Sequence, residues 1–168
     1  MRTLSAVCLL LAMFFASCNF NKKDDCIRLD NEIATMNDSL LQYGSDWGGE
    51  LKVAVNTLDF SGLQPIRTEM QAYIDRKIEH VQQMKNVGGS EKLLETELEF
   101  LQVEKEIVAN KLSAFERFTD SAAMDDLSTA YANMQISALK ENELLEKLHK
   151  LREQYAEKND IPKFIEKN

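Results

Sequence analysis

Residues that interrupt helices are rare in this chain and fall in a few short places. The two prolines are Pro65 and Pro162, and the six glycines lie in three places, at 44–49, at Gly62 and at 88–89. Between them, apolar residues do not alternate with polar ones as in a strand. Glu, Lys, Leu, Gln and Ala, which lose little freedom on entering a helix, dominate instead. The sequence therefore predicts an all-α protein whose helices are separated by glycines.

The first predicted helix runs from about Asp25 to Thr57. Its apolar residues stay roughly in heptad phase across the glycines at 44–49, so both halves face the same core. Each glycine inside a helix costs about 0.8–1 kcal/mol relative to alanine, and three so close together predict a kink or break there. The stripe comprises Ile33, Leu40, Trp47, Leu51, Val55 and Leu58.

Capping signals mark the next two helices. The sequence Ser61-Gly62-Leu63-Gln64 fits a capping box, and Pro65 is tolerated in the first turn that follows. Gly88-Gly89 is expected to end this second helix, and Ser90 to cap a third that carries Glu91 in its first turn. The apolar stripes are Ile66, Met70, Tyr73 or Ile74, Ile78, Val81 and Met84 in the second helix, and Leu94, Leu98, Leu101, Val108, Leu112 and Phe115 in the third.

The fourth helix is expected to follow a cap within 119–121 and to run to about Lys158. The tail 159–168 contains Pro162 and is expected to fray. The apolar residues at helical spacing are Leu127, Tyr131, Met134, Ala138, Leu145, Leu148, Leu151 and Tyr155.

Four amphipathic segments joined by short connections can hide their apolar faces by packing antiparallel. The sequence thus predicts an up-down four-helix bundle over residues 27–158. Two alternatives remain open: a three-helix bundle with a detached first helix, and an intermolecular coiled coil. A continuous dimeric coil is disfavoured, because caps and glycines cut the pattern into pieces of bundle length.

Residues 1–17 have the form of an export signal peptide, with Arg2 before the apolar run Leu4–Phe15. This run of about 12 residues is too short to cross a hydrocarbon core, which needs about 20. Small residues then precede Cys18, and the segment resembles a bacterial lipoprotein signal. That resemblance implies cleavage before Cys18 and a diacylglycerol, with acyl chains such as palmitate, on its thiol. The alternative is an ordinary cleaved signal in which Cys18 has no role.

Residues 18–26 are polar and predict a tether between the lipid and the bundle. The order Lys22-Lys23-Asp24-Asp25 resembles the lysine-then-acidic export signal of surface-exposed lipoproteins of Bacteroidota. It implies display at the cell surface, and the alternative is a lipoprotein of the outer membrane that faces the periplasm. Cys26, placed in this tether, is expected to be an unremarkable free thiol.

The formal net charge of −8 argues against nucleic acid as a partner, because phosphates attract basic surfaces. The acidic runs 95–99 and 125–126 are expected to lie on solvated faces. Trp47 is expected to plug the core beside the glycines rather than to anchor a partner. The methionines Met70, Met84, Met124 and Met134 are expected to fill the core.

The spacing Glu146-x-x-His149 occurs in di-iron bundles, but a metal site would need a second such pair and further inward carboxylates. Leu145 and Leu148 are the core-facing pair, which places Glu146 and His149 on the flank. His80 likewise reads as a boundary histidine. We therefore expect no catalytic residue, no metal and no cofactor.

A lipoprotein signal, Tyr43-Gly44, Asp59-Phe60 and a terminal segment at 154–161 together resemble a group of helical surface lipoproteins of Bacteroidota-type bacteria. This family has no assigned activity, so it implies no functional residue. The sequence thus predicts a non-enzymatic, lipid-anchored envelope protein that has a binding or structural role and contacts the membrane and a protein partner at the envelope. A small-ligand-binding four-helix module and a subunit of an envelope assembly are the alternatives.

Overall fold

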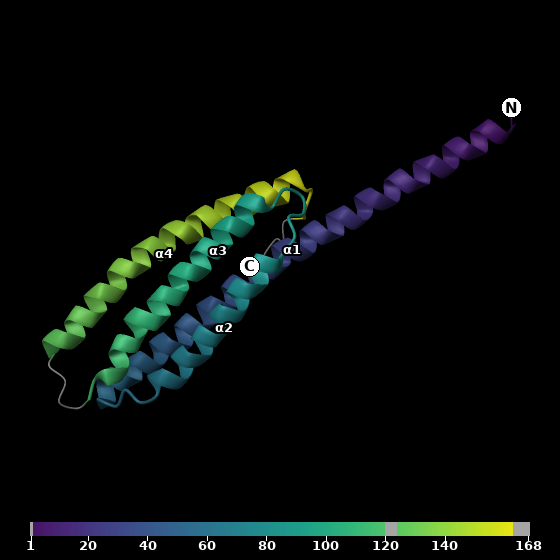
Figure 1. Cartoon of the computed structure of the whole chain (residues 1–168). Coiled ribbons are helices and arrows are strands. Elements are labelled where there is room, and N and C mark those ends of the chain that lie inside the picture. Colours follow the sequence, from purple (N-terminus) through teal and green to yellow (C-terminus); the bar gives the residue numbers. More distant parts are fainter. Residues whose placement is uncertain (1, 120–123, 163–168) are drawn as a thin grey trace.

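The computed structural model describes the backbone of residues 2–119 and 124–162 and the side chains of residues 22–119 and 125–162. These residues form helices and contain no strand, which confirms the predicted all-α class (Figure 1). The α-helices are α1 (Arg2–Thr57), α2 (Leu63–Gln83), α3 (Glu91–Glu106) and α4 (Met124–Lys158), and α3 continues through a π-helix, η1 (Ile107–Lys111), and a 3-10 helix, η2 (Leu112–Arg117).

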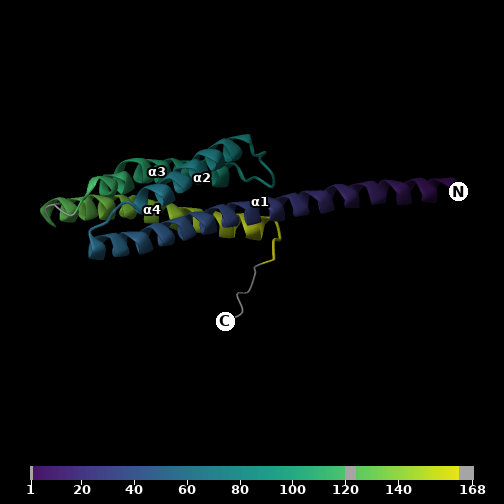
Figure 2. The ribbon, with the colours of Figure 1, turned by 90° about the horizontal axis from the view of Figure 1, so that it is seen from below.

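The helices pack into a bundle in which α3 holds the central position. It packs against α2 on one side and against α4 on the other, while α1 packs chiefly against α2 (Figure 1). The N-terminal part of α1 extends away from the other helices in both views (Figures 1 and 2). A helix with neighbours on both sides buries more than one narrow stripe, and the buried residues of α3 accordingly form one broad face, with exposed residues on the opposite face.

Helix α1 is continuous through Gly44, Gly48 and Gly49, so the helix does not break at the weak point expected at 44–49. Trp47, between Gly44 and Gly48, and Leu51, after Gly49, are each 3% exposed and hold this part of the helix against the core. Burial of two large side chains outweighs the weak helical preference of glycine.

Two capping predictions are wrong in detail. Gly62, not Ser61, is the N-cap of α2 and forms no side-chain capping hydrogen bond. Helix α2 ends at Gln83, several residues before Gly88-Gly89, because the backbone turns extended at Met84. Ser90 is the N-cap residue of α3, as predicted, but its hydroxyl makes no capping hydrogen bond and instead accepts one from the Val87 N–H at 3.1 Å.

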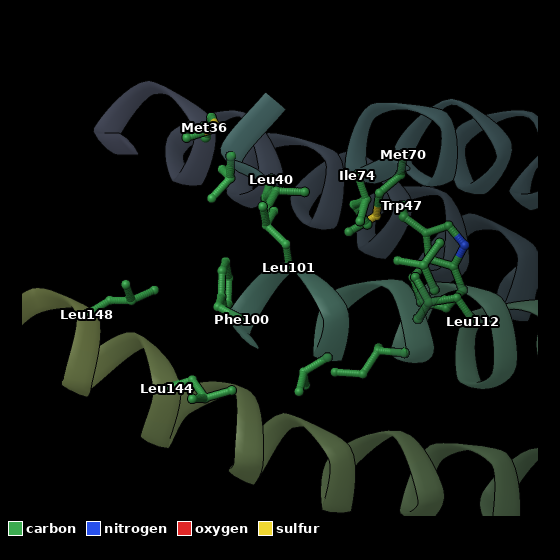
Figure 3. Packing of buried hydrophobic residues seen from close by; sticks show 14 of the residues in the cluster. Met36, Leu40, Trp47, Met70, Ile74, Phe100, Leu101, Leu112, Leu144 and Leu148 are labelled. Carbon is green, nitrogen blue, oxygen red and sulfur yellow. The ribbon is translucent and has the colours of Figure 1, made fainter. Parts of the chain in front are cut away.

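Leu58, predicted to face the core as part of the first stripe, is instead exposed. Leu58 is 46% exposed and has a φ of 61°, because α1 ends one residue earlier, at Thr57. The rest of the first stripe points inward, and Figure 3 shows members of it facing side chains from the other helices. The buried residues that the stripes missed include Leu29, Met36, Ala54, Phe60, Leu63, Val103, Ala130 and Leu144.

Trp47 fills the core as predicted. Its ring packs edge-on against Phe115 at 5.4 Å between centroids, and Phe115 packs in the same way against Tyr131 of α4 at 5.3 Å. Edge-to-face aromatic pairs contribute about 0.5–1.5 kcal/mol beyond the area they bury. The aromatic group thus connects α1, η2 and α4 at one end of the bundle. Met70 is buried and Met84 and Met134 are partly buried, as expected, whereas the Met124 side chain lies outside the described residues.

The opposite end of the bundle is closed by a polar network around Asn159, which we call the Asn159 latch. The Cys26 thiol donates to Asn159 Oδ1 at 3.4 Å, and Asn159 Nδ2 donates to the Gly88 carbonyl at 3.3 Å. The Tyr155 hydroxyl donates to the Val87 carbonyl at 3.1 Å. The latch joins α1, the loop between α2 and α3, and the end of α4.

The core extends further toward both ends of the described chain than the sequence predicts. Cys26 is 1% exposed, so it is a core residue and not part of a tether. Ile161 is 8% exposed, so the described start of the tail, 159–162, packs on the bundle instead of fraying; residues 163–168 lie outside the described part. The backbone of 18–26 is helical and belongs to α1. Among the described side chains, the core therefore runs from Cys26 to Ile161.

We expect Gly88→Ala to lower the free energy of unfolding by at least about 1–2 kcal/mol, measured by urea denaturation. Gly88 has a φ of 62°, where an L residue is strained, and a Cβ there would collide with Cys26 Sγ and Asn159. Gly44→Ala is the matched control, because open space surrounds its Cβ position and alanine is the better helix former. Equal stability changes in the two variants would contradict this account of the latch.

Candidate functional site: buried carboxyl groups in the bundle

Two glutamates of α3 point into the bundle interior. Glu97 is 0% exposed and Glu104 is 5% exposed. They lie seven residues apart and so share one helix face, together with Phe100 and Leu101. The prediction that the acidic run 95–99 is solvated is therefore wrong for Glu97, because α3 is covered on more than one side. Asp125 and Asp126 are exposed, as expected.

Glu97 lies between α3 and α1. Its Oε2 accepts a hydrogen bond from Asn37 Nδ2 at 3.3 Å, while Glu97 Oε1 and Asn37 Oδ1 have no hydrogen-bond partner among the described residues. Burial raises the pKa of Glu97 to about 7, and the Asn37 hydrogen bond and the charge of Arg152 oppose this rise. Arg152 is itself held by Asp30 through two hydrogen bonds of 3.0 and 3.1 Å. A group with this pKa exchanges its proton near neutral pH.

Glu104 faces Glu141 of α4, and the two carboxyl groups share a hydrogen bond. Burial is the main cause that raises the pKa of Glu104, to about 8, and the nearby Glu141 raises it further. The pKa of Glu141 is also raised by burial, whereas its hydrogen bond with Glu104 lowers it. Two carboxylates in contact cannot both ionise cheaply, so the pair holds one proton at neutral pH, with Glu104 as the donor.

A polar cleft lies apart from these carboxyl groups, beside the π-helix η1. It encloses about 640 Å³ between η1 and η2 on one side and the first turns of α4 on the other. Its lining includes Lys111 and Arg117 from the former and Thr129 and Asn133 from the latter. Single-turn π-helices are frequent at functional sites, and this cleft has room for a small polar molecule.

The residues predicted for anchoring and export lie along the N-terminal half of α1. Cys18 lies in α1, and its side chain is outside the described residues. Lys22, Lys23 and Asp24 are exposed on the same helix, next to the half-exposed Asp25. Asp25 pairs with Arg28 at 2.6 Å.

The histidines lie where the flanking positions suggested. Glu146 and His149 are both exposed, and His149 Nε2 lies 3.5 Å from Glu153 of the same helix. His80 is 43% exposed and its Nε2 lies 2.6 Å from Glu32 Oε1. Over the residues that the structure describes, no group of three or more His, Cys, Asp or Glu side chains is arranged to hold a metal ion.

Comparisons with models of protein families, with curated protein sequences and with solved structures find no match for this chain. Within the described ranges, no helix combines the length and the apolar character needed to cross a membrane.

We expect stability to fall as the pH rises from about 4.5 to about 8. The folded state keeps protons on Glu97 and Glu104 that the unfolded chain, with carboxyl pKa values near 4.5, has already released. Their stabilising effect is complete below pH 4.5, and its loss is complete above their folded-state pKa values. Between these limits the slope approaches about 1.4 kcal/mol per pH unit for each group.

Glu97→Gln isolates one of these groups, because an amide does not titrate. The stability of the variant relative to the natural protein should rise between pH 4.5 and pH 7 and stay level on either side, as followed by urea denaturation across pH. Glu95→Gln, at an exposed position of the same helix, is the control and should show little such trend. Parallel pH curves for the natural protein and Glu97→Gln would refute the raised pKa of Glu97.

Proposed function

We propose that this chain is a non-enzymatic lipoprotein of the bacterial outer membrane, anchored by a diacylglycerol on Cys18. Its helices would form an antiparallel up-and-down bundle with a binding or structural role at the envelope. The observation that carries the proposal is the position of the core relative to the signal. All described buried residues lie between Cys26 and Ile161, so cleavage before Cys18 removes no described part of the core.

The N-terminal part of α1 supports the same proposal. It extends away from the bundle, where a processing enzyme and a membrane can reach it (Figure 2). One acyl chain gives marginal membrane binding, whereas the two chains of a diacylglycerol anchor a protein stably. The exposed residues 22–24 begin four residues after the anchor and are open to an export machinery.

Pairs of contacts at the two ends of the bundle support the antiparallel order. Cys26, near the start of the bundle part of α1, contacts Asn159 at the end of α4. At the other end, Trp47 contacts Phe115 of η2, and Phe115 contacts Tyr131 near the start of α4. Helices that alternate in direction bring these segments together with short connections.

The cleft beside η1 favours one alternative, a module that binds a small polar ligand. Its volume of about 640 Å³ is within the usual range for ligand pockets. In this case the lipid would only place the module at the membrane, and the cleft would hold the ligand. A ligand that occupies it should raise the melting temperature of the natural protein but not that of a variant with Asn133→Trp.

We expect Cys18→Ser to abolish incorporation of labelled palmitate into the protein in growing cells of a lipoprotein-making host. Cys26→Ser is the matched control and should retain the label, because the Cys26 thiol is buried in the core. Label that persists in Cys18→Ser would overturn the proposed anchor.

Surface display is tested by protease treatment of intact cells. The natural protein should be cleaved, and a variant with alanine at Lys22, Lys23, Asp24 and Asp25 should be protected until the outer membrane is opened. Protection of both proteins would place the anchored bundle on the periplasmic side instead, with partners in envelope assemblies.

A further inference from the structure

Helix α1 carries a second, solvent-facing stripe that its own bundle leaves uncovered. Asp38, Leu41, Ser45, Gly48 and Lys52 follow one another at spacings of three, four, three and four residues, which places them on one face of the helix. All of them are exposed, and Leu41, at 75%, is the most exposed large apolar side chain described. We call this face the outer stripe.

Three glycines lie on or beside the outer stripe, and no contact between described residues requires glycine there. Around Gly44, Gly48 and Gly49, no atom beyond the adjoining residues and backbone of the same helix lies within 4 Å of the position that a Cβ would occupy. At Gly62 and Gly88, by contrast, a Cβ would meet other side chains. Glycine weakens a helix, and its benefit at a surface is that another backbone can approach closely.

The charges of the outer stripe are self-complementary. Asp38 and Lys52 lie seven residues to either side of Ser45, and neither forms an ion pair with a described residue. If a second α1 runs antiparallel and is centred on Ser45, Asp38 lies opposite Lys52 of the second copy. Leu41 then lies opposite Gly49, where space is open. A parallel pair would place like charges together.

We propose that the outer stripe of α1 is the interface of an antiparallel homodimer. Each copy inserts Leu41 into the hollow at Gly48 and Gly49 of the other, and two Asp38–Lys52 ion pairs fix the register. Such an interface has twofold symmetry, so the same patch serves both copies. The dimer does not depend on the proposed lipid anchor, because every residue that forms it lies after the tether.

Ser45 lies on the twofold axis, which gives a direct test. With the full chain in cell membranes, Ser45→Cys should form a disulfide-linked dimer on mild oxidation, since cysteines crosslink when their Cα atoms lie about 4.4–6.8 Å apart. Asn56→Cys is the matched control at another exposed position of α1. Residue 56 would lie opposite position 34 of the second copy, about 33 Å along the helix from the other residue 56 at about 1.5 Å per residue. The Asn56→Cys protein should therefore stay monomeric.

Charge exchange tests the direction of the two helices. In the Ser45→Cys background, Asp38→Lys or Lys52→Asp should each lower the crosslinked fraction several-fold, because each places like charges opposite one another. Both changes together should restore it. Circular dichroism should show the same helix content in all of these variants, since both positions are exposed.

Three results would overturn the dimer. The first is a monomeric Ser45→Cys protein. The second is crosslinking of Asn56→Cys to the same extent, which indicates a parallel pair. The third is a Ser45→Cys disulfide to a different protein, which assigns the outer stripe to another partner. Charge reversals without effect on the crosslinked fraction would likewise remove the proposed ion pairs and register.

Discussion

The burial of α3 on two sides is the constraint on which the other features of the bundle depend. Because α2 and α4 both pack against it, one broad face of α3 is buried and carries Glu97 and Glu104, while the other acidic residues of this helix lie on the opposite, exposed face. Glu97 and Glu104 are consequently dehydrated, and Asn37 and Glu141 are their polar contacts from α1 and α4. An apolar core has no group that titrates, whereas these two buried carboxyl groups make the stability of the bundle depend on pH.

Periodicity in the sequence was sufficient to predict the helices and most of their inward residues. Ile33, Leu101 and Leu148 were found because an apolar residue every three or four positions has one common explanation. Glu97 could not be found in this way. A glutamate is almost always solvated, and its burial here depends on how many helices surround α3, which no local pattern records. Helical spacing does place Glu97 and Glu104 on the same face as Phe100 and Leu101, but their residue type argues for an exposed position.

Local preference failed where distant contacts outweighed it. Glycines at 44–49 predict a weak helix, but Trp47 and Leu51 pack against residues far along the chain, and α1 remains one continuous helix. Cys26 gave the opposite error, because polar neighbours suggested a tether while Asn159 supplied a partner from the far end of the sequence. In both cases the decisive residue lies on another helix.

The Asn159 latch also bears on when the protein folds. Its hydrogen bond between Cys26 and Asn159 spans 133 residues of sequence, so it can form only after almost the whole chain has been synthesised. Contacts of such long range are slow to form, because a large loop must close before they stabilise anything. During synthesis the nascent chain is therefore left without the contact that ties its two ends together. Until Asn159 has been made, the Cys26 thiol and the Gly88 carbonyl lack these hydrogen bonds, so this end of the bundle closes late.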